Sequence, residues 1–271
     1  MKKALIFILC MLFTAGSSFV YADKVYNQLL KSPDYEAKYL AALAYYQKKD
    51  YKKSIRLLED VADYFKGTEK SQNVLYTLAN SHFYRKDYLS SEHYYQIYVN
   101  TFMRGEHYTE CLFMLAYSLY KQSPEPELDQ RTTVKAIERF QLFLEQFPYG
   151  EQTDKARELL TELYDKLAQR ELANARLYYN LGNYRGNNYR AAIITAQNAI
   201  LDFPDSQYKE EFAAIIVRSK YKEAVNSVAE KMQERFEDAS DECYYFLQEY
   251  PESKFTKEVE KIHKQIKKHL N

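Results

Sequence analysis

The sequence predicts an all-α fold, an α-solenoid of about five stacked helical hairpins, and three observations predict it. A short phrase built on an aromatic residue recurs five times along the chain. A small residue stands eleven positions before each of these aromatics, with apolar residues at helical spacing between the two. The 271 residues include only six glycines, too few for the many tight turns of a β-sandwich, a barrel or a dinucleotide-binding fold.

Each recurring phrase is expected to end the second helix of a hairpin. The phrases occupy Tyr64–Gly67, Thr101–Gly105, Phe147–Gly150, Phe203–Ser206 and Tyr250–Ser253. The small residues upstream of them are Ser54, Ser91, Ala136, Ala192 and Ala239. Because the distance between packed helices depends on the side chains at their contact, we expect these five residues at helix crossings. Proline follows the aromatic in the last three copies and stops the helix there.

A partner helix is expected upstream of each of these helices. The expected ranges are 34–48, 71–85, 108–121, 154–181 and 209–233. In the second copy Leu78, Ala79 and Ser91 resemble the pattern of the tetratricopeptide repeat, and the 37 residues from Ser54 to Ser91 are close to its period of ~34. Such repeats stack on their neighbours and form a groove that binds a partner.

Residues 1–22 have the pattern of a secretory signal peptide. Two lysines precede an apolar core at 4–13, which is too short to span a bilayer, and Ala22 ends a possible cleavage site. Of the three cysteines, Cys10 lies in this segment. Cys111 and Cys243 lie among apolar neighbours, where they are expected to be core residues. The sequence leaves open whether the two form a disulfide.

Charge and motif content exclude several classes of function. The 38 basic residues balance the 38 acidic ones, so the chain as a whole has no net positive charge with which to bind nucleic acid or an anionic membrane. No two histidines have metal-site spacing, and no phosphate loop or nucleophile elbow is present. We therefore expect that the protein is not an enzyme, and that it has no cofactor, no metal site and no catalytic residue. The basic end, 257–268, is expected to cap the solenoid, with lipid binding as the alternative.

One face of the first helix in each early hairpin is expected to form the groove. The expected peptide-binding residues on it are Tyr39, Tyr46, Asn73, Tyr76, Asn80, Tyr84, Phe113 and Tyr117. Tyrosine provides a large contact area with a polar tip, and the Asn80 amide can donate to and accept from a peptide backbone. The competing interpretation is that these side chains pack between helices.

The order of motifs resembles the BamD (ComL/YfiO) family. The resemblance rests first on Ser123-Pro124, Leu128–Gln130, Thr132 and Phe147-Pro148. Similar stretches at 29–35, 166–179 and 189–206 extend it to about residues 25–260. The family's signal segment ends in an acylated cysteine. In this sequence the early cysteine is Cys10, inside the apolar core after Leu9, so lipid anchoring is not carried over.

The resemblance implies a non-enzymatic scaffold of the outer-membrane β-barrel assembly machinery, at the periplasmic face of the outer membrane. It implies that the N-terminal repeats, 23–122, bind unfolded outer-membrane proteins, and that the C-terminal repeats, 123–271, dock on a BamA-like barrel-insertion protein. Two alternatives remain. One is another periplasmic tetratricopeptide scaffold, for example one that coordinates cell-wall synthesis. The other is a binder of small molecules or glycans, which would need a deep closed pocket.

Overall fold

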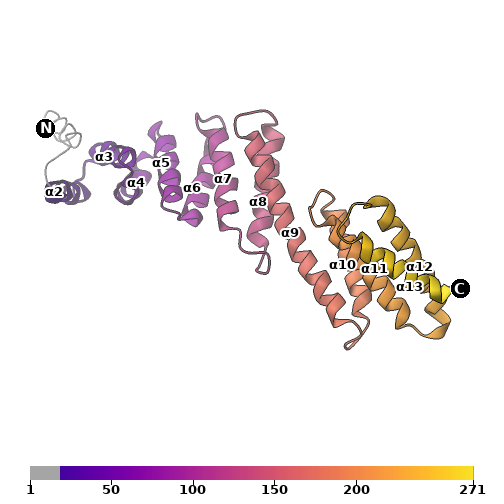
Figure 1. The fold of residues 1–271 in the computed structure, drawn as a ribbon. Coiled ribbons are helices and arrows are strands. Elements are labelled where there is room, and N and C mark those ends of the chain that lie inside the picture. Colours follow the sequence, from indigo (N-terminus) through magenta and orange to yellow (C-terminus); the bar gives the residue numbers. More distant parts are fainter. Residues whose placement is uncertain (1–18, 271) are drawn as a thin grey trace. The chain divides into compact units, whose positions relative to one another are not determined.

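The computed structural model describes residues 19–270, which form helices joined by short turns and no strand, as the sequence predicts (Figure 1). The helices are α2 (Phe19–Leu30), α3 (Tyr35–Gln47), α4 (Tyr51–Phe65), α5 (Lys70–Tyr84), α6 (Tyr88–Thr101), α7 (Tyr108–Gln122), α8 (Arg131–Gln146), α9 (Thr153–Leu181), α10 (Asn188–Asp202), α11 (Lys209–Val225), α12 (Ala229–Glu249) and α13 (Thr256–Leu270). Most of the expected signal segment, residues 1–18, lies outside the described part. No helix from α2 to α13 combines the length and apolar content that crossing a bilayer requires.

The chain divides into two compact units. The first contains the chain up to Ser123 together with Thr132–Ala156, and therefore holds α2 to α8. The second contains Pro124–Arg131 and the chain from Arg157 onward, with α10 to α13. Within each unit, consecutive helices pack as antiparallel neighbours, which is the arrangement of a repeat solenoid.

The hairpin turns of the first two repeats have the same local cause. Lys49 has a left-handed backbone with φ of 61°, and the Asp50 amide donates to the Tyr45 carbonyl at 2.9 Å. The aspartate then starts the next helix by accepting from the Lys53 amide. Lys86 and Asp87 repeat this geometry with a φ of 63°. This Schellman-type ending followed by an aspartate cap explains why a Lys-Asp-Tyr triplet occurs at both turns.

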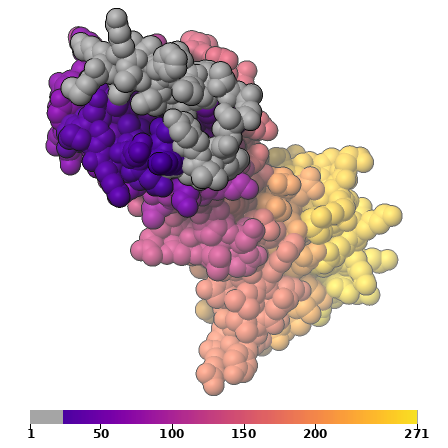
Figure 2. All heavy atoms as spheres, turned by 90° about the vertical axis from the view of Figure 1, so that its left-hand side faces the viewer, coloured from indigo at the N-terminus to yellow at the C-terminus, as the bar shows by residue number. Residues whose placement is uncertain are grey.

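The small residues expected at helix crossings are all fully buried, which confirms that expectation. In the first unit Ser91 illustrates the contact: its hydroxyl donates to the Ala79 carbonyl of α5 at 3.1 Å and lies 3.2 Å from the Ser118 hydroxyl of α7. The α3–α4 core adds Leu57, Leu58 and Val61 with no exposed surface. In the space-filling view the start of the described chain is the indigo region (Figure 2).

One expected helix is wrong in the second unit. The range 209–233 is interrupted, because α11 ends at Val225 and α12 begins at Ala229. The side-chain amide of Asn226 donates to the Lys222 carbonyl at 2.7 Å, and the Ser227 hydroxyl donates to the Glu223 carbonyl at 2.6 Å. Side chains of this type compete with the backbone for helical hydrogen bonds, so they end the helix without proline or glycine.

The turn between α9 and α10 is the helix–helix turn that the sequence predicts for 182–187. Gly182 has a φ of 54°, and a Cβ there would lie 2.7 Å from the Tyr189 hydroxyl, so a larger residue would have to displace the Tyr189 ring. Asn187 then caps α10 by accepting from the Arg190 amide at 3.2 Å.

Cys111 and Cys243 are free, buried and located in different units. Burial raises the pKa of the Cys243 thiol to about 12 and raises that of Cys111 even further. A thiol in this state contains little of the reactive thiolate at neutral pH. In a Cys10→Ser protein we therefore expect maleimide labelling to be slow until denaturant is added, when two thiols per chain react. Rapid labelling of the native protein, followed by mass spectrometry, would contradict this.

Candidate functional site: an aromatic strip in the first unit

The residues expected to bind a peptide lie on three helices of the first unit. Tyr39 and Tyr46 belong to α3, and Phe113 and Tyr117 belong to α7. The remaining four are on α5 and are Asn73, Tyr76, Asn80 and Tyr84. Tyr39, Asn80 and Phe113 are buried, whereas the other five are half-buried or exposed. The structure therefore separates the expected set into a surface layer and a supporting layer.

The surface layer is a chain of aromatic rings that we call the aromatic strip. Its members are Tyr46, Tyr51, Phe83, Tyr84, Tyr117 and Tyr120. Tyr84 is 55% exposed, and its ring centroid lies 6.5 Å from that of Tyr46 and 5.1 Å from that of Tyr51. Phe83 continues the contact at 5.5 Å to Tyr117. The strip therefore spans three successive repeats.

Three members of the strip were not among the expected site residues. These are Tyr51, Phe83 and Tyr120. The available signal was the position of Tyr51 and Phe83 beside the turns: residues there lie at the same end of each hairpin, next to Tyr46 and Tyr84. Tyr120 lies one turn of α7 from Tyr117 and stacks on it at 5.7 Å.

Lys121 extends the strip with a positive charge. Its ammonium nitrogen lies 4.8 Å from the ring centroid of Tyr117 and 5.3 Å from that of Tyr120. The residue is exposed at the end of α7. A cation held over aromatic faces in this way remains available to a carboxylate from outside.

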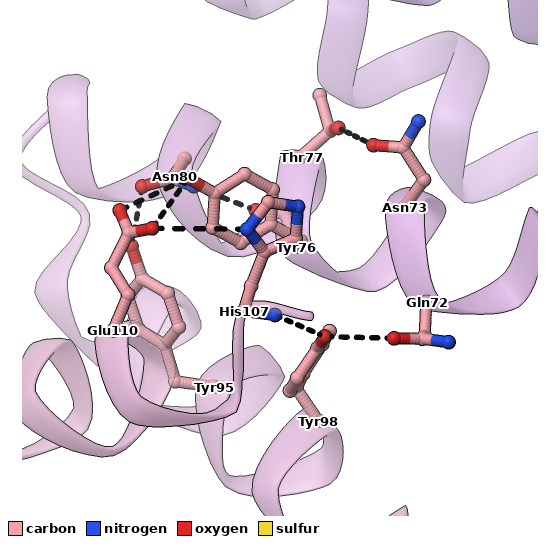
Figure 3. A network of polar contacts seen from close by, with 9 residues as sticks. All are labelled: Gln72, Asn73, Tyr76, Thr77, Asn80, Tyr95, Tyr98, His107 and Glu110. Carbon is pink, nitrogen blue, oxygen red and sulfur yellow. Dashed lines mark hydrogen bonds and ion pairs between the residues drawn. The ribbon is translucent and has the colours of Figure 1, made fainter. Parts of the chain in front are cut away.

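A polar network fixes the tyrosine of the second repeat (Figure 3). The Tyr76 hydroxyl contacts both carboxylate oxygens of Glu110, at 2.9 and 3.0 Å, and donates its proton to that carboxylate. The His107 ring stacks on the Tyr76 ring with a centroid distance of 3.9 Å and an interplanar angle of 11°. Contacts on an edge and on a face leave the Tyr76 side chain one orientation, which is useful for a rigid binding surface.

The Asn80 amide is used within the protein. Its nitrogen donates to the Tyr76 carbonyl at 3.1 Å, and its oxygen accepts from the Tyr95 hydroxyl at 2.7 Å. The side chain is only 3% exposed. In this structure Asn80 therefore positions Tyr76 and Tyr95, and a hydrogen bond to a peptide backbone would require one of these bonds to be exchanged.

Tyr39, Asn73 and Phe113 also have partners inside the unit. The Asn73 amide donates to the Tyr39 hydroxyl at 2.9 Å and so joins the first two repeats. Phe113 lies edge to face against Phe140 and Phe143, with centroid distances of 5.9 and 5.5 Å. These contacts give the three residues a packing role, and Phe113 also stacks on Tyr117 of the strip at 5.8 Å.

The phenols of Tyr46 and Tyr76 remain protonated over the physiological pH range. Burial raises the pKa of Tyr46, and the neighbouring Tyr84 and Tyr51 raise it further. Burial and the hydrogen bond to Glu110 raise the pKa of Tyr76 in the same way. Both hydroxyls therefore act as neutral donors. The part of the chain that the structure describes contains no group of three histidine, cysteine, aspartate or glutamate side chains placed to hold a metal ion.

The Tyr95–Asn80 bond gives a test of the supporting layer. Tyr95→Phe removes the hydroxyl and leaves the buried Asn80 oxygen without its donor, so we expect a loss of about 1–3 kcal/mol in the free energy of unfolding. Urea unfolding measures it. Tyr149→Phe is the control, because Tyr149 is 93% exposed and should change stability little. Equal stability of the two variants would contradict the proposed importance of the network.

Comparison with known proteins identifies the family. A family model described as an outer membrane lipoprotein, YfiO, matches residues 32–236. The putative outer membrane protein assembly factor BamD of Aquifex aeolicus (strain VF5) is 27% identical over 207 residues, or 75% of this chain. The match covers 66% of that relative, slightly less than two thirds of its length. The resemblance drawn from the ordered motifs is thereby confirmed, and the chain belongs to the YfiO (BamD) family of outer membrane lipoproteins.

Proposed function

We propose that this protein is a non-enzymatic scaffold of outer-membrane β-barrel assembly, acting at the periplasmic face of the outer membrane. The family match over residues 32–236 carries the proposal, and the similarity to a putative outer membrane protein assembly factor supports it. In this role the protein binds one chain and presents it to another. Since no bond is made or broken, no cofactor or metal is needed.

The N-terminal repeats, 23–122, bind an extended segment of an unfolded barrel protein. Tyr46, Tyr76, Tyr84 and Tyr117 contact the segment, because tyrosine buries a large area at a low cost in rotamer entropy. Asn80 and Phe113 contact Tyr76 and Tyr117 and help to hold them in place, while Tyr39 and Asn73 pack within the same unit. Lys121 suits the carboxylate of an aromatic-ended C-terminal segment, whose terminal ring would stack on the neighbouring strip.

The C-terminal repeats, 123–271, dock on the periplasmic domains of a BamA-like barrel-insertion protein. The second unit exposes large apolar side chains of the kind that a protein partner covers. Leu201 on α10 is 77% exposed, and Tyr244 and Tyr245 on α12 are 65% and 70% exposed. Tyrosine is among the residues enriched at such interfaces.

Photo-cross-linking in cells tests the recognition step. A benzophenone amino acid at position 84 is expected to capture unfolded barrel precursors. The same probe at position 149 is the control, since Tyr149 is an exposed tyrosine of the same unit but lies outside the strip. Equal capture at both positions, or capture of cell-wall enzymes at position 84, would overturn the proposal.

Co-purification after mild cross-linking tests the docking step separately. Recovery of a barrel protein with repeated periplasmic domains is expected from the intact protein. Its absence, together with recovery of cell-wall enzymes, would favour a scaffold for a different envelope process. The two experiments separate client recognition from docking, because the first unit can bind clients in a protein whose second unit has no partner.

A further inference from the structure

The last helix, α13, has two chemically opposite faces. Val259, Ile262 and Ile266 are buried and belong to the core that α11 and α12 also line. The other face consists of lysines. We call this the lysine face, and it contains Lys257, Lys261, Lys264 and Lys268. At ~100° per residue these four side chains fall within about 60° of one another, directly opposite the buried face.

Within the described chain the lysines of this face form no ion pair, although Glu260 lies within one helical turn of Lys257 and Lys264. All four lysines are exposed, and none is within ion-pair distance of a carboxylate among the described residues. Glu258, one of the two acids of α13, instead accepts two hydrogen bonds from the Arg218 guanidinium, at 2.7 and 2.5 Å. The zero net charge of the whole chain therefore conceals a local cationic surface.

Lys267 adds positive charge beside this face, whereas the surroundings of His263 on the same helix favour its neutral form. His263 is half-buried, and its Nε2 lies 3.2 Å from the Ser240 hydroxyl of α12. Burial lowers the pKa of His263, and the charge of the nearby Lys267 lowers it further. Lys267 is exposed and adjoins the lysine face in the last turn.

We propose that the lysine face of α13 binds the surface of a membrane that contains anionic phospholipids. The four ammonium groups extend along about 16 Å of a rigid helix, from Lys257 to Lys268. Clusters of lysine on one side of a helix suit diffuse phospholipid charge, which needs no fixed geometry of acceptors. The binding places the end of the second unit against the lipid surface.

A membrane fits this surface better than an acidic protein does. Protein interfaces are depleted in lysine and enriched in tyrosine, tryptophan and arginine, which act as buried anchors. The lysine face contains none of these residues. Because the apolar side of α13 is occupied by the core, the helix lies on the lipid without inserting, and binding depends on charge alone.

The experiment measures binding of the full chain to vesicles that contain 30% phosphatidylglycerol and to vesicles of phosphatidylcholine alone. The measured quantity is the ratio of the two affinities, because the apolar residues 4–13 would contribute to both. The test variant is Lys257→Gln with Lys261→Gln and Lys264→Gln. Glutamine has a helix propensity close to that of lysine, and the buried face is untouched.

The matched control replaces Lys52, Lys66 and Lys135 by glutamine. These lysines are exposed in the first unit, so the control changes the net charge equally. We expect the test variant to lose the preference for anionic vesicles by about fivefold per lysine, and the control to keep it. Raising the salt to 0.5 M should abolish the preference of the intact protein. Circular dichroism is used to check that both variants are folded.

Three results would overturn the proposal. The intact protein could show no preference for anionic vesicles, or the test variant could keep the preference of the control. The third result is that polyglutamate, used as a protein-like polyanion, binds the intact protein as tightly as the vesicles do at equal charge concentration. That outcome would assign the lysine face to an acidic protein partner.

Discussion

Replacing Tyr46 and Tyr84 together by alanine is expected to weaken binding of an aromatic-ended peptide by about 2–4 kcal/mol, a 30- to 1,000-fold rise in Kd. The two rings are neighbours at 6.5 Å and come from different repeats, so the double variant opens the strip where the first repeat meets the second. Fluorescence anisotropy with a labelled peptide from the end of a barrel protein measures the change.

The matched control is Tyr149→Ala with Tyr184→Ala. Both control tyrosines are exposed, at 93% and 64%, and neither belongs to the strip. Each double variant loses two tyrosine rings, so the two variants differ only in where those rings are removed. A Kd that is unchanged in a folded Tyr46 and Tyr84 variant would show that the strip does not bind the peptide.

The sequence predicted the helices well where the signal was local. Buried small residues at fixed distances from a closing aromatic mark each hairpin, because both the crossing and the turn depend on residues close in the chain. The end of α11 was missed for a related reason. Asn226 and Ser227 end that helix with their own side chains, and such residues also occur inside helices, so their presence alone does not predict a break.

The candidate site was harder to predict, because tyrosine suits both the surface and the core. Tyr95 and Tyr98 are fully buried, Tyr84 is half exposed and Tyr149 is almost entirely exposed. The helical period gives the side of the helix on which a residue lies, and the neighbouring repeat decides whether that side is covered. Phe113 shows the consequence, since its apparent groove position is closed by Phe140 and Phe143 of α8.

The unit to which the segment 124–131 belongs also depends on contacts that are distant in the sequence. Within this segment the Asp129 carboxylate accepts from the Arg131 amide at 3.0 Å. The buried Gln130 amide adds bonds to the carbonyls of Glu125 and Leu128 at 2.7 and 3.1 Å. These contacts are local to the segment. Its membership of the second unit, while its flanks belong to the first, cannot be read from a local pattern.

Phe113→Ala is expected to lower the free energy of unfolding by about 3–5 kcal/mol, because the ring is 7% exposed and its removal leaves a cavity against Phe140 and Phe143. Urea unfolding followed by circular dichroism measures this loss. Phe113→Leu keeps most of the buried volume and should lose distinctly less stability. The fraction of the alanine variant that remains folded should bind the peptide with nearly the original affinity, since the ring supports the strip without reaching its surface.

Tyr117→Ala, one turn further along α7, separates support from contact. Tyr117 is half-buried and belongs to the strip, so its removal should weaken the peptide complex while costing less stability than Phe113→Ala. If the Phe113 variant instead kept its stability and lost the peptide, the ring would have to reach the bound segment. That would require α7 and α8 to separate during binding, and the groove would then be a surface that opens for its client.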